Sequence, residues 1–180
     1  MSRKRSPIPI EDFRDVVEYN PETGAFLWKP RAETHYTIRT WNARFAGAVA
    51  TRPHKKGYER IQLRGKDFLA HRVAYALYFR EQPLEDIDHI NGQRNDNRIS
   101  NLRLATQSQN NANQRSRTDF PKGVSLRTNC PRNPYYAQLK VEGKHVLAKC
   151  FSSLEEAVNA YNTALIGHFG DHGQLSTLSR

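Results

Sequence analysis

Hydrophobic and polar positions follow helical and strand-like periods in different parts of the chain. Apolar residues recur with a helical period between positions 10 and 17, and the run AFLWKPR predicts a strand that ends at Pro30. The stretch GYERIQLRGKDFLAHRVAYALYF (57–79) predicts a hairpin with RGK as its turn, followed by a helix that ends by Pro83. Residues 31–56 carry few signals, so no element is predicted there.

The passage DIDHINGQRNDNRISNLRLATQSQNNAN (86–113) has seven asparagines between Asn91 and Asn113. DIDHI predicts a short strand, NG a turn and NLRLAT a second strand. Thr106 is placed to cap a helix that begins at Gln107. The predicted order is therefore strand, long polar loop, strand and helix.

After a polar, basic stretch the C-terminal part has the pattern of a small independent domain. GVSLR, YYAQLKV and KHVLAKCF predict three strands, with EGK (142–144) as the turn between the last two. SSLEEAVNAYNTALIGHFG predicts an amphipathic helix capped by Ser152 or Ser153. The expected fold class is α+β, with a three-stranded antiparallel sheet packed on one helix at the C-terminal end.

Composition narrows the class of protein. A chain of 180 residues holds one ordinary domain or two small ones, and a mean hydropathy of −0.80 implies a modest core. No apolar run reaches the roughly 20 residues that span a bilayer, and no apolar stretch of a secretory signal follows the basic N-terminus. A cytoplasmic location is therefore expected.

Cys130 and Cys150 are the only cysteines, and the lack of a CxxC pair argues against a four-ligand zinc site.

The formal charge of +10 favours a polyanionic partner, nucleic acid first and an acidic membrane surface second. Residues 1–85 carry 16 basic and 10 acidic side chains, whereas residues 86–114 carry three of each and are neutral. Residues 115–122 and 123–180 add +2 each. The asparagine-rich passage is therefore not the main electrostatic contact, and the segments on either side are expected to hold the nucleic acid.

Asp88 and His89 carry the residue types that phosphodiester hydrolysis needs. The reaction requires a base for water, stabilisation of the leaving 3′ oxygen and neutralisation of phosphate charge. Histidine, with an ordinary pKa of about 6.5, is a base at neutral pH, and carboxylate and amide oxygens suit a hard divalent cation. Adjacent strand residues point to opposite faces, and the attacking and leaving oxygens lie on opposite sides of phosphorus. Adjacent residues at a strand end can therefore place a base and a metal on opposite sides of the phosphate, so the spacing of Asp88 and His89 is compatible with hydrolysis.

The segment DHINGQRNDNRISNLRLATQSQNNAN resembles the motif of the HNH endonucleases (ββα-metal fold), in the form found in phage-encoded and homing nucleases. The resemblance implies that Asp88 is a metal ligand, His89 the general base and Asn101 a brace that orients the histidine. It implies Asn110 as the second ligand, with Asn111 and Asn113 as rivals. One Mg²⁺ or Mn²⁺ ion per active site and double-stranded DNA as substrate follow from the same resemblance.

The resemblance extends to both sides of the motif. The upstream AHR sequence is similar to that preceding the motif in phage HNH proteins, and KGVSLR…YYAQLKVEGKHVLAKCFSSLEEAVNAY resembles an AP2 DNA-binding domain. Leu126, Tyr136 and Lys149 depart from the usual AP2 residues. The implied organisation is a basic arm (1–8), an HNH domain (9–114, core 86–114), a linker (115–122) and an AP2-like domain (123–175). Candidate DNA contacts are His71, Arg72, Arg94, Arg103, Arg127, Gln138, Lys140 and Lys144.

Other interpretations stay open at this point. Asp88 and His89 can be a strand-end carboxylate and a hydrogen-bonded histidine, and Asn91, Asn95 and Asn97 are best interpreted as turn residues. The rival function is a non-catalytic DNA-binding regulator with a degenerate nuclease fold, and a weaker rival is a protein directed to RNA. One active site per chain favours nicking by a monomer unless two copies assemble, and the target sequence is not readable.

Overall fold

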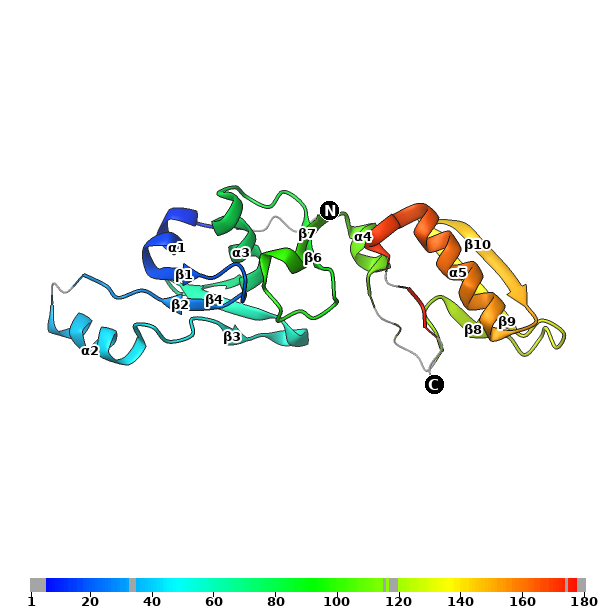
Figure 1. The fold of residues 1–180 in the computed structure, drawn as a ribbon, viewed down its shortest axis with the longest axis horizontal. Helices are drawn as coiled ribbons and strands as arrows, with labels where there is room; N and C mark the ends of the chain where they lie inside the picture. Colours follow the sequence, from blue (N-terminus) through cyan, green and yellow to red (C-terminus); the bar gives the residue numbers. More distant parts are fainter. Residues whose placement is uncertain (1–5, 33–34, 115, 117–119, 174, 178–180) are drawn as a thin grey trace. The chain divides into compact units, whose positions relative to one another are not determined.

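The computed structural model describes residues 6–32, 35–114, 116, 120–173 and 175–177. The chain divides into two compact units, Met1–Leu104 and Ala105–Arg180 (Figure 1). Most of the expected basic arm, residues 1–5, lies outside the described residues, as do residues 115 and 117–119 of the expected linker. The domain boundaries expected from the sequence remain predictions.

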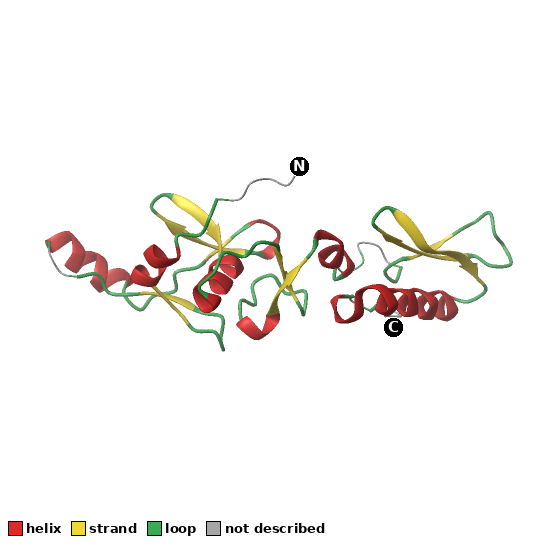
Figure 2. Ribbon diagram, turned by 90° about the horizontal axis from the view of Figure 1, so that it is seen from above, coloured by secondary structure: helices red, strands yellow, loops and turns green. Residues whose placement is uncertain are grey.

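The first unit contains short helices and three small sheets, coloured by element type in Figure 2. Its helices and strands are α1 (Ile10–Val16), β1 (Val17–Tyr19), β2 (Phe26–Trp28), α2 (Tyr36–Phe45), β3 (Arg52–Pro53), β4 (Glu59–Leu63), β5 (Lys66–Leu69), α3 (Ala70–Phe79), β6 (Asp86–His89) and β7 (Leu102–Ala105), with 3₁₀ turns η1 (Lys55–Gly57) and η2 (Ile99–Asn101). β3, β4 and β5 form an antiparallel sheet, β1 pairs antiparallel with β2, and β6 pairs with β7.

The core of the first unit lies where α1 and α3 pack against each other and α3 packs on β4 and β5. Phe13, Phe26, Ile61 and Val73 are completely buried there. The predicted hairpin is confirmed: β4 and β5 join through Arg64 and Gly65, both at positive φ (49° and 76°), as a tight hairpin turn requires. Ile87 of β6 belongs to this core, so the core holds that strand in place.

Two elements of the first unit differ from the sequence-based expectation. The first helix ends at Val16, and the chain passes directly into β1, which the helical period had concealed. α2 forms in the stretch 31–56, where nothing was predicted, and Ile38, Trp41 and Phe45 make a half-buried stripe along one of its sides. His35 caps it by accepting from the Thr37 backbone N–H.

The second unit consists of α4 (Gln107–Ala112) and a sheet covered by a long helix. Its other elements are β8 (Val124–Leu126), β9 (Tyr135–Val141), β10 (Lys144–Phe151), α5 (Leu154–Phe169) and η3 (Gly170–His172). The strand order is β10-β9-β8, antiparallel throughout, with α5 packed on all three strands. Ser153 caps α5 by accepting from the Glu156 backbone N–H at 3.2 Å.

The core of the second unit combines one face of the sheet with the apolar side of α5: Val124, Ala137, Leu139, Ala157, Val158, Tyr161 and Leu165. A Cβ at Gly123 would lie 2.0 Å from the Tyr161 ring, so only glycine allows this close packing. Cys130 and Cys150 are both free and half-buried.

The mixed helices and small antiparallel sheets confirm the α+β class and are compatible with an HNH domain. A specific AP2-like arrangement in the second unit stays a prediction. Among the described residues, no helix has the length and apolar character needed to cross a bilayer.

Candidate active site

β6 places Asp88 and His89 together at the edge of the first unit's core. Both residues are buried, at 5% and 4% exposure. Ile87, just before them, packs into the hydrophobic core, and the Ile90 N–H donates to the Asn101 carbonyl at 2.9 Å. The strand is therefore held at both ends, and the carboxylate and the imidazole have fixed surroundings.

Asp88 is paired with Arg103 of β7. The Nε and Nη2 groups of Arg103 donate to one carboxylate oxygen, Oδ2, at 3.1 and 3.0 Å. Their side chains are only 6% and 15% exposed, so solvent screens this ion pair little. Arg103, which was predicted to contact DNA, thus forms an ion pair with Asp88, the predicted metal ligand.

The imidazole of His89 lies against two other rings. The His71 ring lies 5.0 Å away, edge to face at 74°, and the Tyr58 ring lies 6.0 Å away. Tyr58 also contacts His71 at 5.3 Å, and the guanidinium of Arg94 lies 5.1 Å from the Tyr58 ring. Of the residues of this unit that were predicted to contact DNA, His71 is therefore the one whose ring lies against the imidazole of His89, the predicted general base.

Burial lowers the pKa of His89 below its ordinary value. The neighbouring carboxylates of Asp88 and Asp96 and the side chain of Asn97 oppose this effect, and Arg94 adds to it. Because the net direction is downward, the neutral imidazole is favoured at pH 7, and only the neutral form can accept a proton.

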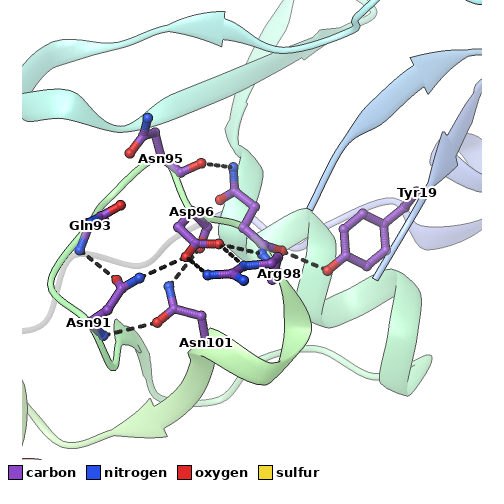
Figure 3. A network of polar contacts seen from close by, with 8 residues as sticks. Tyr19, Asn91, Gln93, Asn95, Asp96, Arg98 and Asn101 are labelled. Atoms are coloured by element: carbon purple, nitrogen blue, oxygen red, sulfur yellow. Dashed lines mark hydrogen bonds and ion pairs between the residues drawn. The ribbon is translucent and has the colours of Figure 1, made fainter. Parts of the chain in front are cut away.

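The loop between β6 and β7 is held by its own polar side chains (Figure 3). The Asn101 side chain accepts from the Asn91 N–H at 3.0 Å and donates to the Asp96 carbonyl at 2.9 Å. Arg98 donates to both Asp96 oxygens, at 2.8 and 2.6 Å, and this hydrogen bonding lowers the Asp96 pKa to about 2. Asn101 thus links the two ends of the loop; its effect on catalysis stays a prediction.

Asn91 and Asn97 differ sharply, although both were interpreted as turn residues. The Asn91 side chain accepts from the Gln93 N–H at 2.8 Å, which is an Asx turn as expected. Asn97 is instead 1% exposed, and its Nδ2 donates to Glu59 Oε2 at 2.8 Å. Tyr58, Glu59 and Asn97 were missed as site residues because their partners are distant in sequence.

The proposed second metal ligand, Asn110, lies on α4 in the second unit. Thr106 caps this helix in a capping box with Gln109, as predicted for Thr106. The side-chain oxygen of the rival Asn111 accepts from Gln107 and Gln114, at 3.1 and 3.3 Å, whereas the side-chain amide of Asn110 has no hydrogen bond to a described residue. The assignment of Asn110 stays a prediction.

The comparison with known families supports one class of site. Residues 68–112 match the family model of the HNH endonucleases. This segment runs from the end of β5 through α3, β6 and β7 to α4 and includes His71, Asp88, His89, Asn101 and Asn110. It is less than half of the 180 residues, and it supports an HNH nuclease. No curated protein and no solved structure matches the chain.

Two of the other residues of the first unit that were predicted to contact DNA donate hydrogen bonds to backbone carbonyls. Arg72 donates to the carbonyls of Glu85 and Pro83, at 3.2 and 3.0 Å, and so fastens α3 to the chain that leads into β6. Arg94 donates to the Lys56 carbonyl at 3.0 Å. Both arginines thus hold parts of the first unit together, and their contact with DNA remains a prediction.

The predicted contacts of the second unit lie mainly on the sheet face away from α5. Gln138 and Lys140 are exposed and alternate with the buried Ala137 and Leu139 of β9. The guanidinium of Arg127 lies 3.5 Å from the centre of the Tyr136 ring, which stands on that same face by alternation. Lys144 is paired with Val141 near the hairpin turn and is not aligned with this set.

Proposed function

We propose that the protein is a metal-dependent DNA endonuclease in which His89 is the general base. The observation that carries the proposal is a buried imidazole, with its pKa lowered, beside a buried carboxylate on the strand that the HNH family match covers. A neutral imidazole held in a fixed place accepts a proton from water more readily than a charged, mobile one.

The donor groups fit one hard divalent cation. HNH endonucleases generally depend on such an ion, and Mg²⁺ or Mn²⁺ takes oxygen ligands, often only one or two from the protein. Asp88 and Asn110 would hold it. Among the described residues no group of three or more His, Cys, Asp or Glu side chains is arranged for a metal. When bound, the ion supplies charge stabilisation at the leaving 3′ oxygen.

The residues of the chain supply the remaining steps. His89 takes the proton of the attacking water, and Asn101 keeps the loop that follows His89 in shape. Arg103 neutralises Asp88 in the structure and, if the ion takes over the carboxylate, becomes available for a phosphate. The products expected are a 5′-phosphate and a 3′-hydroxyl, and the monomer is expected to nick one strand.

The second unit is proposed to supply DNA affinity. Its outer sheet face, made by Arg127, Tyr136, Gln138 and Lys140, combines positive charge, hydrogen-bonding groups and an aromatic ring. Positive charge gives affinity for the phosphate backbone, and polar side chains on a sheet can contact base edges. An AP2-like mode of binding belongs to this proposal.

The second candidate is a DNA-binding regulator without catalysis. The observation that favours it is the Arg103–Asp88 pair, in which a side chain of the protein itself balances the carboxylate charge. The presence together of Asp88, His89, Asn101 and Asn110 favours the nuclease, because a relic site is free to lose any one of them.

The decisive experiment is nicking of supercoiled plasmid in Mg²⁺ or Mn²⁺, with EDTA as control. The nuclease predicts nicked circles with metal and none with EDTA. Binding without nicking in either metal identifies the regulator. Competition with RNA at fixed salt distinguishes a protein directed to RNA, since electrostatic affinity varies steeply with salt.

A further inference from the structure

The positive charge of the first unit is concentrated in one segment, residues 29–56. This segment holds seven lysines and arginines and a single acidic residue, Glu33, which lies outside the described residues. The other residues among 1–85 carry nine basic and nine acidic side chains, so the segment supplies the whole +6 of that part of the chain. It precedes residue 68, where the match to the HNH family begins, and the family match therefore gives this charge no role.

Other exposed arginines of the first unit are paired with carboxylates. Arg14 pairs with Glu11 at 2.9 Å, and Arg64 pairs with Asp12 at 3.0 Å. A carboxylate partner reduces the positive potential that an approaching phosphate meets. The segment 29–56 holds only one carboxylate for its seven cations, so this part of the unit keeps a positive potential.

α2 carries part of this charge on a helix with a fixed place. The Trp41 ring lies 6.0 Å from the ring of Trp28 in β2, edge to face at 77°. The Asn42 side chain accepts from the Arg31 N–H at 2.9 Å and donates to the Arg31 carbonyl at 2.8 Å. The Gly47 N–H donates to the Trp28 carbonyl at 2.8 Å. α2 is therefore tied to β2 and to the chain that follows it, and it is not a loose arm.

The exposed side of α2 is basic and carries no carboxylate. By helical spacing, Tyr36, Thr40 and Ala43 lie along its centre, with Arg39 and Arg44 at its two edges, and all five are exposed. Thr40 and Ala43 are small, so a partner can approach the helix closely between the two arginines. A surface with two cations beside a shallow centre suits a chain of phosphate groups.

Two arginines of this region lie over aromatic rings. The guanidinium of Arg31 lies 3.8 Å from the centre of the Trp41 ring, and that of Arg44 lies 5.2 Å from the centre of the Phe45 ring. A ring attracts the cation through its quadrupole but has no net charge, so it orders the side chain without neutralising it. Stacking uses the face of the guanidinium and leaves the N–H groups at its edge for a phosphate.

DNA fits this surface better than the other polyanion that the charge allows, an acidic membrane surface. A helix that binds in a membrane surface buries a wide apolar face among the lipids. The apolar side of α2 has only three half-buried residues, and one of them, Trp41, already packs against Trp28. β6, with the candidate catalytic pair, belongs to the same unit, and the HNH family implies DNA as substrate.

The basic segment reaches from the far end of the first unit to the candidate active site. Figure 1 shows α2 at the end of this unit opposite to β6 and β7. The chain then returns through β3 to η1, where Arg94 donates to the Lys56 carbonyl at 3.0 Å and lies 5.1 Å from the Tyr58 ring. A contact at α2 would therefore involve phosphates away from the one that is cut.

We propose that α2, with Arg31, Arg39 and Arg44, binds the phosphate backbone of DNA away from the scissile phosphate. The nuclease unit then holds its own substrate in addition to the second unit. The inference rests on the proposed function for DNA as the partner. It concerns binding alone, so it is tested in EDTA, where no cleavage occurs.

The test compares two double variants of the full-length protein that lose the same charge. Arg39→Gln with Arg44→Gln removes two cations from α2, whereas Arg14→Gln with Arg64→Gln removes two exposed arginines that have carboxylate partners. Affinity for a DNA duplex is measured by fluorescence anisotropy over a range of salt. We expect the α2 variant to bind about 10-fold more weakly and the slope of log K against log salt to fall in magnitude by about 2, because two phosphate contacts are lost. The control variant should keep the wild-type slope.

The two tryptophans of the chain give a readout at the surface itself. Trp28 and Trp41 are the only tryptophans in the sequence, and they lie against each other with the Arg31 guanidinium over Trp41. Tryptophan emission therefore reports on this region alone. We expect bound duplex to protect the emission from quenching by acrylamide in the wild type and in the control variant, and to lose that protection in the α2 variant.

The outcomes separate this inference from the proposed function. If the wild type nicks DNA while the α2 variant keeps the wild-type slope, or while both double variants lose slope equally, the inference is wrong and the nuclease stands. Acrylamide quenching that bound duplex leaves unchanged also contradicts a contact at α2. If the wild type never nicks, the nuclease proposal fails, and the slopes still decide whether α2 binds DNA. An α2 variant that loses binding to phosphatidylserine vesicles and keeps its affinity for DNA would identify a membrane surface as the partner and overturn the inference.

Discussion

The loop between β6 and β7 and the outer sheet face of the second unit are both rich in polar side chains, yet they are built in opposite ways. In the loop, Asn97 and Asn101 are buried and hydrogen-bonded to the protein itself. On the sheet face, Gln138 and Lys140 are exposed. Polar groups already satisfied by the protein give a rigid site, and polar groups left in water are available for a partner. This contrast supports the proposal that the chemistry lies in the loop region and DNA binding on the sheet face.

The largest effect that would sharpen this contrast is expected at Asp88. Asp88→Asn keeps an oxygen for Arg103 but removes the charge that attracts a cation. Loss of several kcal/mol of charge stabilisation corresponds to a fall in nicking rate of about a thousandfold at fixed Mg²⁺. Rates are measured across a Mg²⁺ titration for Asp88→Asn and for Asn110→Ala, with Asn111→Ala as the matched control. Titration curves identical to the wild type would place the ligands elsewhere.

A smaller effect is expected for a substitution on the sheet face, and it should alter DNA binding and not the cleavage rate. Lys140→Ala should weaken DNA binding several-fold and reduce the slope of log K against log salt by about 1, because one phosphate contact is lost. The rate at saturating DNA should not change. Lys149→Ala removes the same charge from the residue paired with the buried Ala137, and it should leave the slope unaltered. Equal slopes in the two variants would contradict a binding role for this face.

The sequence was informative wherever the signal is local. The β4–β5 hairpin followed from alternation and its turn, and the start of α4 followed from the capping preference of Thr106. The family match covers the segment in which Asp88 and His89 had been singled out from residue type and spacing.

The parts that escaped prediction depend on distant residues. Asn97 is separated from Glu59 by 38 positions and from Tyr19 by 78, so nothing nearby distinguishes this buried amide from the Asx turn at Asn91. The pairing of Arg103 with Asp88 likewise depends on how β6 meets β7. By contrast, α2 was missed although Ile38, Trp41 and Phe45 recur with a helical period, so its signal was local and was overlooked.

The smallest effect concerns the stability of the loop. Asp96 has its pKa lowered from 3.8 to about 2, mainly by hydrogen bonds from Arg98, so its charged form stabilises the fold above pH 4. That contribution is lost as the pH falls from 4 towards 2. Asp96→Asn should lower the melting temperature at pH 7 by about 2–4 °C, since solvent screens the exposed Arg98. The difference from the wild type should shrink below pH 4, and a constant difference down to pH 2 would argue against this ion pair.

The central claim is that the loop region does the chemistry while the rest of the protein holds the DNA, and His89→Ala tests it most directly. Cleavage under single-turnover conditions and DNA affinity are measured on the same preparation. Loss of a general base predicts a fall in cleavage rate of about a thousandfold with an affinity close to that of the wild type. Cleavage by His89→Ala at the wild-type rate would contradict the account.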